Sequence, residues 1–260
     1  MLTRTFLHIP GVGPKTERAL WDQGCSDWDC FLGETRYEVG PACYESARLE
    51  IETSKASLEG FVHQYFARSL GVAEAWRAFP EFRKKAVFLD IETDGGDRGD
   101  SVTMVGLYDG ENFRALIKDE DLSEFPDVIS HYGMIITFFG TGFDLPMLQR
   151  CYPNLRFDQI HMDLCPTLKR LGHHGGLKKI EKALGIERPP ETLGLSGMDA
   201  VRLWRAYRLG SDSALERLIA YNRDDVVNLE KLAEIAYRRL FGLTVPRELR
   251  RNEAPVEASA

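Results

Sequence analysis

The chain has 260 residues, a formal net charge of −7 and 43% hydrophobic residues. This composition is typical of a globular protein with one large domain or two smaller ones. It excludes collagens, coiled coils and membrane proteins, because no apolar run approaches the roughly 18 residues that cross a bilayer. A protein that coats nucleic acid non-specifically is usually basic, so this class is excluded as well. If the chain acts on a polyanion, it must do so through local cations or bound metal ions.

The N-terminus and the cysteines indicate a cytoplasmic protein. The first residues contain neither a long apolar region nor a small-residue cleavage site, so they do not resemble a secretory signal. The 5 cysteines include no C-x-x-C pair and do not form a disulfide framework, so we expect reduced thiols. Cys25, Cys30 and Cys43 lie close together in the sequence, and a metal site formed by these three is an alternative.

Residues 1–80 have helical patterning and predict a small helical domain, with one or two helices between residues 41 and 71. Near its start, a glycine-rich turn precedes a helix, and it resembles the hairpin of a helix–hairpin–helix motif. Glycines in such a turn expose backbone N–H groups to a phosphate, and a lysine adds a charge contact. We therefore expect nucleic acid to be bound by Gly11, Val12, Gly13 and Lys15. The alternative is a tight turn that joins helices and binds no ligand.

Residues 86–245 have a different pattern, which predicts an α/β domain. The expected strands are 86–92, 101–108, 113–117 and 134–139, with a hairpin turn at Asp109-Gly110. The expected helices are 121–130, 145–151, 163–171, 177–184, 200–207 and 214–240. An antiparallel meander, then a helix and a strand that returns to the sheet, describe an α/β layer fold. We expect residues 246–260 to form a flexible tail.

Carboxylates at the end of the first strand form the first candidate site. Side chains alternate along a strand, so Asp90 and Glu92 share one face. Two like charges on an otherwise apolar strand repel one another and resist burial, and a divalent cation would remove that conflict. The alternative is a strand end that emerges into solvent with both acids solvated.

Two further acidic positions follow in the chain. Asp144 comes after a strand and immediately before a helix with Pro146 in its first turn, so it is either a site residue or a helix N-cap. Tyr221 and Asp225 are four residues apart on a predicted helix and lie on one face. The alternative for this pair is the acidic turn of a solvated helix.

Taken in order, these motifs resemble those of the DEDD exonuclease superfamily, which has a ribonuclease-H-like fold, and within it the YprB-like family. The three motifs are Asp90-x-Glu92, Phe143-Asp144-x-Pro146 and Tyr221-x-x-x-Asp225. Weaker similarities are Asp163-Leu164 and the helix at 177–181. The resemblance covers about residues 86–240 and implies a mixed sheet flanked by helices, with the small helical domain preceding it.

Two positions place the chain within this superfamily. One branch has a His five residues before the last Asp, and the other has a Tyr four residues before it. Ala220 and Tyr221 occupy these positions, so the resemblance is to the tyrosine branch. Phe139 is a departure, because an Asn is common five residues before the second-motif Asp. The change leaves the metal ligands intact but puts a substrate-orienting hydrogen bond, and with it substrate preference, in doubt.

The resemblance implies two Mg²⁺ or Mn²⁺ ions held by Asp90, Glu92, Asp144 and Asp225. Asp90 would bridge both ions, Glu92 and Asp225 would complete the first, and Asp144 would help to place the second. Tyr221 would orient the attacking water and, with an ordinary pKa near 10, is not expected to act as a phenolate base.

Cations that contact substrate are expected between the second and third motifs. Together with Thr93, we expect Lys178 to bind nucleic acid. The wider segment is a phosphate track or, alternatively, a solvated helix face. Its basic residues are Lys169, Arg170, His173, His174, Lys178, Lys179, Lys182 and Arg188.

The predicted function is a metal-dependent 3′–5′ exonuclease acting on single-stranded nucleic acid ends. DNA is slightly favoured over RNA, on the helix–hairpin–helix resemblance alone. The alternatives are a nucleic-acid-binding module with a vestigial site, or a structure-specific endonuclease or ribonuclease that uses the same carboxylates.

Overall fold

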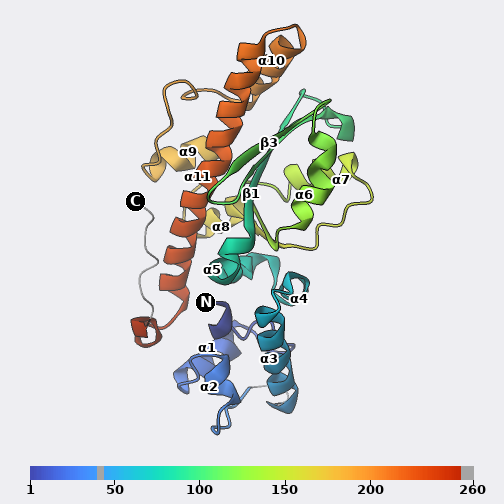
Figure 1. The fold of residues 1–260 in the computed structure, drawn as a ribbon. Coiled ribbons are helices and arrows are strands. Elements are labelled where there is room, and N and C mark those ends of the chain that lie inside the picture. The colour runs from blue at the N-terminus through green and yellow to red at the C-terminus, as the bar shows by residue number, and fades with distance from the viewer. Residues whose placement is uncertain (40–43, 253–260) are drawn as a thin grey trace.

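The computed structural model describes residues 1–39 and 44–252, and its centre is one mixed sheet flanked by helices (Figure 1). The strand order is β3-β2-β1-β4-β5. Strands β1, β2 and β3 form an antiparallel meander, whereas β4 and β5 run parallel to β1. The α/β, ribonuclease-H-like fold class with a helical N-terminal region is therefore confirmed. The strands are β1 (Ala86–Thr93), β2 (Val102–Tyr108), β3 (Phe113–Ile117), β4 (Met134–Thr137) and β5 (Ile160–Asp163).

Two features of the sheet differ from the sequence prediction. Strand β5 was not predicted, because its four residues come directly before a helix and lack a long apolar run. It pairs with β4 from Met134↔Ile160 to Thr137↔Asp163. Strand β4 ends at Thr137 rather than at residue 139, since Phe139 has a φ of 66° and leaves the extended conformation.

The central strand β1 presents different residues to the two faces of the sheet. Val87, Leu89 and Ile91 pack with residues of α6 (Phe125–Ser130) and α7 (Asp144–Cys151). Phe88 packs on the other face, in a core shared with α8 (Leu164–Arg170), α9 (Leu177–Ala183) and α11 (Asp212–Thr244). Because side chains alternate along a strand, Asp90 and Glu92 lie on the α11 face.

Helix α11 is the longest helix among the described residues and runs across the sheet (Figure 1). Its buried residues include Leu218, Tyr221, Asp225, Val226 and Leu229, which face the sheet side of the helix. Helix α10 (Gly197–Arg208) packs against it and begins with a capping box at Ser196. No helix in the described part of the chain is long and apolar enough to cross a membrane.

The N-terminal region is helical and lies below the sheet in Figure 1. One apolar core runs from this region into the sheet and α11, and it includes Trp28, Phe66, Trp76 and Tyr237. The domain boundary expected near residues 80–86 is therefore crossed by continuous packing. The helical segments are η1 (Leu2–Arg4), α1 (Pro14–Asp22), α2 (Trp28–Leu32), α3 (Tyr44–Glu59), α4 (His63–Ser69), η2 (Val72–Ala78), α5 (Phe79–Phe82) and η3 (Arg83–Lys85).

The end of the described chain is a 3₁₀ helix, Arg247–Asn252, in a segment that the sequence predicts as flexible tail. Leu249 packs against the core, and its carbonyl oxygen accepts a hydrogen bond from Arg4. These contacts explain why residues 247–252 are folded. Residues 253–260 of the predicted tail lie outside the described residues.

Candidate active site

Three carboxylates meet where β1 and α11 pack together. Asp90, Glu92 and Asp225 each offer one oxygen, and these oxygens lie within 4.8 Å of one another. Glu92 is 7% exposed and Asp225 5% exposed. The solvated strand end and the solvated helix turn, considered as alternatives from the sequence, are therefore wrong.

Asp144 reaches the same strand from the opposite helix layer. It is the first residue of α7, whose N-cap residue is Phe143 and has no side-chain cap. Instead of capping the helix, Asp144 Oδ1 accepts a hydrogen bond of 3.1 Å from the backbone N–H of Ile91, between the two acidic positions of β1. Asp144 is buried but does not belong to the group of three mutually close carboxylates.

Burial and mutual repulsion make these carboxylates difficult to ionise. Both effects raise the pKa of Asp90 well above its ordinary value. Burial raises the pKa of Glu92 to about 8, with repulsion from Asp225 adding to it. Burial also raises the pKa of Asp144, to about 7. The pKa of Asp225 is raised by burial and lowered in part by Lys178 and Arg188.

The donor set fits hard divalent cations. All four candidate ligands are carboxylates, which Mg²⁺ and Mn²⁺ prefer. Within the described residues, ion pairs with Lys178 and Arg188 reach only Asp225 of the four. Among the described residues, Asp90, Glu92 and Asp144 therefore have no side-chain cation as an ion-pair partner.

Asn222 is a member of the site that the sequence analysis missed. Its Nδ2 donates to Asp90 Oδ2 over 3.0 Å and to Glu92 Oε1 over 3.4 Å. It lies one residue after Tyr221 on α11 and is fully buried. Its Oδ1 is buried without a hydrogen-bond partner, so the amide presents a further unsatisfied oxygen beside the acidic cluster.

Tyr221 is buried beside Asp225, as their spacing on the helix predicts. Its hydroxyl oxygen accepts a hydrogen bond of 2.5 Å from Lys178 Nζ, which lies 4.4 Å from the centre of the Tyr221 ring. Burial and the neighbouring carboxylates raise the pKa of Tyr221. Tyr221 therefore remains a neutral phenol at physiological pH.

Behind Asp225 lies a buried charged network. Arg188 donates two hydrogen bonds to Glu181, of 2.6 and 2.7 Å, and a third, of 2.5 Å, to Asp225 Oδ1. Asn228 donates to Glu181 as well. The Arg188 side chain is 4% exposed, so its place in a phosphate track is wrong. It lies between two carboxylates, and the sequence carries no local signal for this pairing.

The other residues predicted to bind nucleic acid lie on different elements of the fold. Thr93 ends β1, where the pairing with β2 is irregular. Lys178, on α9, donates a hydrogen bond to Tyr221 and pairs with Asp225, and its side chain is about one-third exposed. Of the remaining basic segment, Arg170 pairs with Glu74. Of this predicted set, Lys178 lies beside the acidic cluster, and binding of phosphate by it remains a prediction.

The N-terminal turn lies in the helical region, away from the sheet (Figure 1). Gly11 has a φ of 85°, Gly13 is the N-cap of α1 and Lys15 is exposed, whereas Val12 is buried. A three-residue 3₁₀ helix, η1, stands before the turn. Nucleic-acid binding by this turn remains a prediction.

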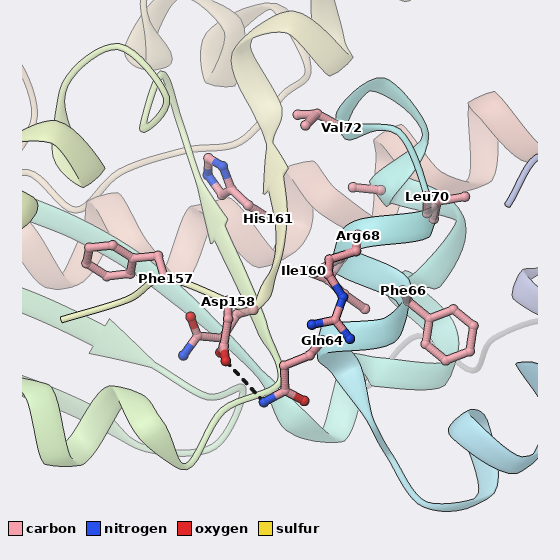
Figure 2. Close-up of a pocket in the computed structure, with 12 residues that line it drawn as sticks. Gln64, Phe66, Arg68, Leu70, Val72, Phe157, Asp158, Ile160 and His161 are labelled. Carbon is pink, nitrogen blue, oxygen red and sulfur yellow. Dashed lines mark hydrogen bonds between the residues drawn. The ribbon is translucent and has the colours of Figure 1, made fainter.

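Two other features lie apart from the acidic cluster. A cavity of about 320 Å³ opens between α4, η2 and β5 and is lined by residues that include His161, Arg68 and Asp158 (Figure 2).

The described cysteines are free thiols: Cys25, Cys30, Cys151 and Cys165. Cys43 lies outside the described residues. In the described ranges, no cysteine belongs to a cluster of three or more candidate metal ligands.

Three comparisons relate this chain to known proteins. A sequence model described as the RNase_H superfamily matches residues 87–237, more than half of the chain. A search of curated proteins finds no match. Among solved structures, the chain is similar to the family B DNA polymerase from the hyperthermophilic archaeon Pyrobaculum calidifontis, with 17% identity and a TM-score of 0.48 over 61% of this chain. The matched part is 25% of that polymerase chain, and the likeness carries no inference about activity.

Proposed function

The chain belongs to the RNase_H superfamily, and on this basis we propose that it is a metal-dependent nuclease that removes nucleotides from the 3′ ends of single-stranded nucleic acid. One observation carries the proposal. Four carboxylates converge on β1, of which Glu92, Asp144 and Asp225 are buried and Asp90 is half-buried, and side-chain cations within the described residues pair with only one of the four. Such a cluster is costly to bury unless it holds metal ions.

In this proposal, Asp90, Glu92 and Asp225 would hold one divalent ion. Asp144 would help to hold a second, and its bond to Ile91 N–H fixes where its carboxylate stands. Bound divalent ions would supply charge stabilisation for phosphodiester hydrolysis. Asn222 keeps Asp90 and Glu92 in place by donating to one oxygen of each.

In the proposal, Tyr221 acts as a hydrogen-bond donor. Because Lys178 donates to the phenol oxygen, the Tyr221 O–H hydrogen is free to point at another acceptor. Its raised pKa keeps that hydrogen in place. Tyr221 therefore orients the attacking water, or a phosphate oxygen, as a hydrogen-bond donor and does not abstract a proton.

The same proposal includes three finer points: membership of the tyrosine branch, similarity to the YprB-like family, and a preference for DNA over RNA. The DNA preference depends on the N-terminal turn, where Gly11, Gly13 and Lys15 would hold a phosphate. Exchange of Lys15 for Glu should then raise the Kd for DNA without changing the rate at saturation. A lower rate at saturation with unchanged affinity would assign the turn another role.

The test is hydrolysis of single-stranded DNA and RNA oligonucleotides labelled at either the 5′ or the 3′ end, with Mg²⁺, Mn²⁺ or EDTA. Stepwise shortening of 5′-labelled substrate, lost in EDTA and in Asp90→Asn, supports the proposal. Internal cuts at junctions would instead support a structure-specific endonuclease. Binding without cleavage under any metal condition would indicate a vestigial site.

A further inference from the structure

The loop that joins β4 to α7 holds an aromatic side chain in an unusual backbone conformation. Phe139 has a φ of 66°, a left-handed conformation that bulky residues rarely adopt, and its side chain is 54% exposed. Neither local propensity nor burial accounts for a phenylalanine at such a position. Strained residues of this kind persist only where the surrounding structure holds them, and they gather at functional sites.

The surroundings hold this loop firmly. Asp163, at the end of β5, accepts hydrogen bonds from the backbone N–H groups of Phe139, over 2.8 Å, and Thr141, over 3.0 Å. The Phe139 carbonyl oxygen accepts from Gly142 and Phe143. These hydrogen bonds hold the loop on both sides of Phe139 and involve its backbone, not its ring.

The ring of Phe139 lies over Gly142, two residues before Asp144. A Cβ on Gly142 would stand 2.6 Å from Phe139 Cζ, so only glycine permits this placement. Phe143, the residue before Asp144, is 41% exposed as well. Two exposed rings therefore lie in the loop that leads to Asp144, one of the proposed metal ligands.

Comparison with a second strained phenylalanine shows what is unusual about Phe139. Phe61 has a φ of 51° and is 49% exposed, but its ring packs edge-on against Phe82, with centroids 6.1 Å apart. Phe139 has no aromatic partner among the described residues. About half of its side chain is open to solvent.

We propose that Phe139 is a stacking platform for the base of the nucleotide at the cleaved end. A flat, exposed ring in the loop that leads to Asp144 suits an unstacked nucleobase, because every base offers a π-face. The platform requires a single-stranded end, since paired bases are stacked on their neighbours. This inference rests on the proposed nuclease function.

The first experiment compares two substrates that differ only at the 3′ terminus: an oligonucleotide with a normal base and one with an abasic residue. Phe139→Leu keeps an apolar side chain but removes the flat ring. It should raise KM for the normal substrate about tenfold and leave KM for the abasic substrate unchanged. Phe61→Leu is the matched control and should alter neither value. An equal KM for the normal substrate in wild type and Phe139→Leu would overturn the platform while leaving the nuclease function intact.

Two further variants separate the ring's position from protein stability. Phe139→Gly should raise the melting temperature, because glycine adopts this φ without strain, and still raise KM. Gly142→Ala should displace the ring and raise KM while Phe139 remains present. An unchanged KM in Phe139→Gly and in Gly142→Ala would overturn the platform.

A binding assay keeps the inference testable if no hydrolysis is found. A single-stranded DNA with 2-aminopurine at its 3′ end should lose fluorescence on binding to the wild-type protein through stacking, and lose less on binding to Phe139→Leu. Failure of hydrolysis alone would refute the proposed function. Equal quenching by both proteins would refute the platform.

Discussion

The side chain of Asn222 occupies the space that a Cβ on Gly106 would need. Gly106 lies on β2 directly opposite Asp90 on β1. A Cβ added at Gly106 would stand 1.7 Å from Asn222 Oδ1. Because Gly106 has no side chain, β2 leaves room for the Asn222 amide, which donates to Asp90 and Glu92.

Gly106→Ala should therefore damage the site from a position that touches no carboxylate. The added methyl group must displace Asn222, and the two acidic side chains of β1 lose a shared donor. We expect hydrolysis to slow by roughly 10- to 100-fold, as for a lost hydrogen bond of about 1–3 kcal/mol. Single-turnover rates at saturating metal would measure this change.

Gly71→Ala is the matched control, because a Cβ there meets nothing within 4 Å. Its rate should equal that of the wild type. A normal rate in Gly106→Ala, with a crystal structure in which Asn222 has moved, would show that Asn222 has no part in the chemistry.

This pair also shows what the sequence could and could not predict. Asp90 with Glu92, and Tyr221 with Asp225, follow from strand and helix periodicity, which are local properties. Asn222 and Gly106 meet across strands and a helix that are far apart in the sequence. Nothing within either segment indicates the contact, although Asn222 lies inside the motif between Tyr221 and Asp225.

The buried pairing of Arg188 and the strand β5 were not predicted for similar reasons. Arg188 stands in a basic segment, where a charge usually means solvent or phosphate contact, yet it is buried between Glu181 and Asp225. Strand β5 has four residues and is specified by pairing with β4. In both cases tertiary contacts override the local pattern.

The buried carboxylates predict how stability depends on pH in the absence of metal. The folded-state pKa values of Glu92 and Asp144, about 8 and about 7, lie above the ordinary values of 4.5 and 3.8. Groups of this kind stabilise the fold below their ordinary pKa, and the stabilisation is lost as the pH rises through the folded-state values. In EDTA, the melting temperature should fall between pH 5.5 and pH 9, by on the order of 5 °C.

Mg²⁺ or Mn²⁺ should reverse this loss, because bound cations favour ionised ligands. The rise in melting temperature on adding metal should therefore be larger at pH 9 than at pH 5.5. Asp90→Asn should flatten the EDTA profile, since one of the repelling charges is gone, and should reduce the metal-dependent rise. A metal-dependent rise that is equal at both pH values would argue against ion binding by these carboxylates.

The buried network behind Asp225 should be sensitive to the loss of its cation. Arg188→Met leaves Glu181 buried without its charge partner, which is expected to lower the free energy of unfolding by about 3–5 kcal/mol. The double variant with Glu181→Gln should recover part of that loss, because the unpaired charge is gone. Urea unfolding of the four proteins in the cycle measures the coupling. Additive losses would mean that the two side chains act independently.

Tyr221→Phe tests the proposed donor role most directly. The variant keeps the ring, and with it the contact between Lys178 Nζ and the ring face. It loses only the hydroxyl, so Lys178 loses an acceptor and the attacking group loses a donor. Single-turnover hydrolysis should slow by roughly 10- to 100-fold, corresponding to about 1–3 kcal/mol in the barrier, while metal and substrate affinity change little.

Tyr207→Phe is a suitable control, because its hydroxyl bonds to Glu120 outside the site. It should retain the wild-type rate. The raised pKa of Tyr221 adds a second expectation: the rate should show no rise that follows ionisation of a phenol below pH 10. A Tyr221→Phe protein with an altered melting temperature and a wild-type single-turnover rate would make Tyr221 a packing residue. It would also remove the main support for placing the chain in the tyrosine branch.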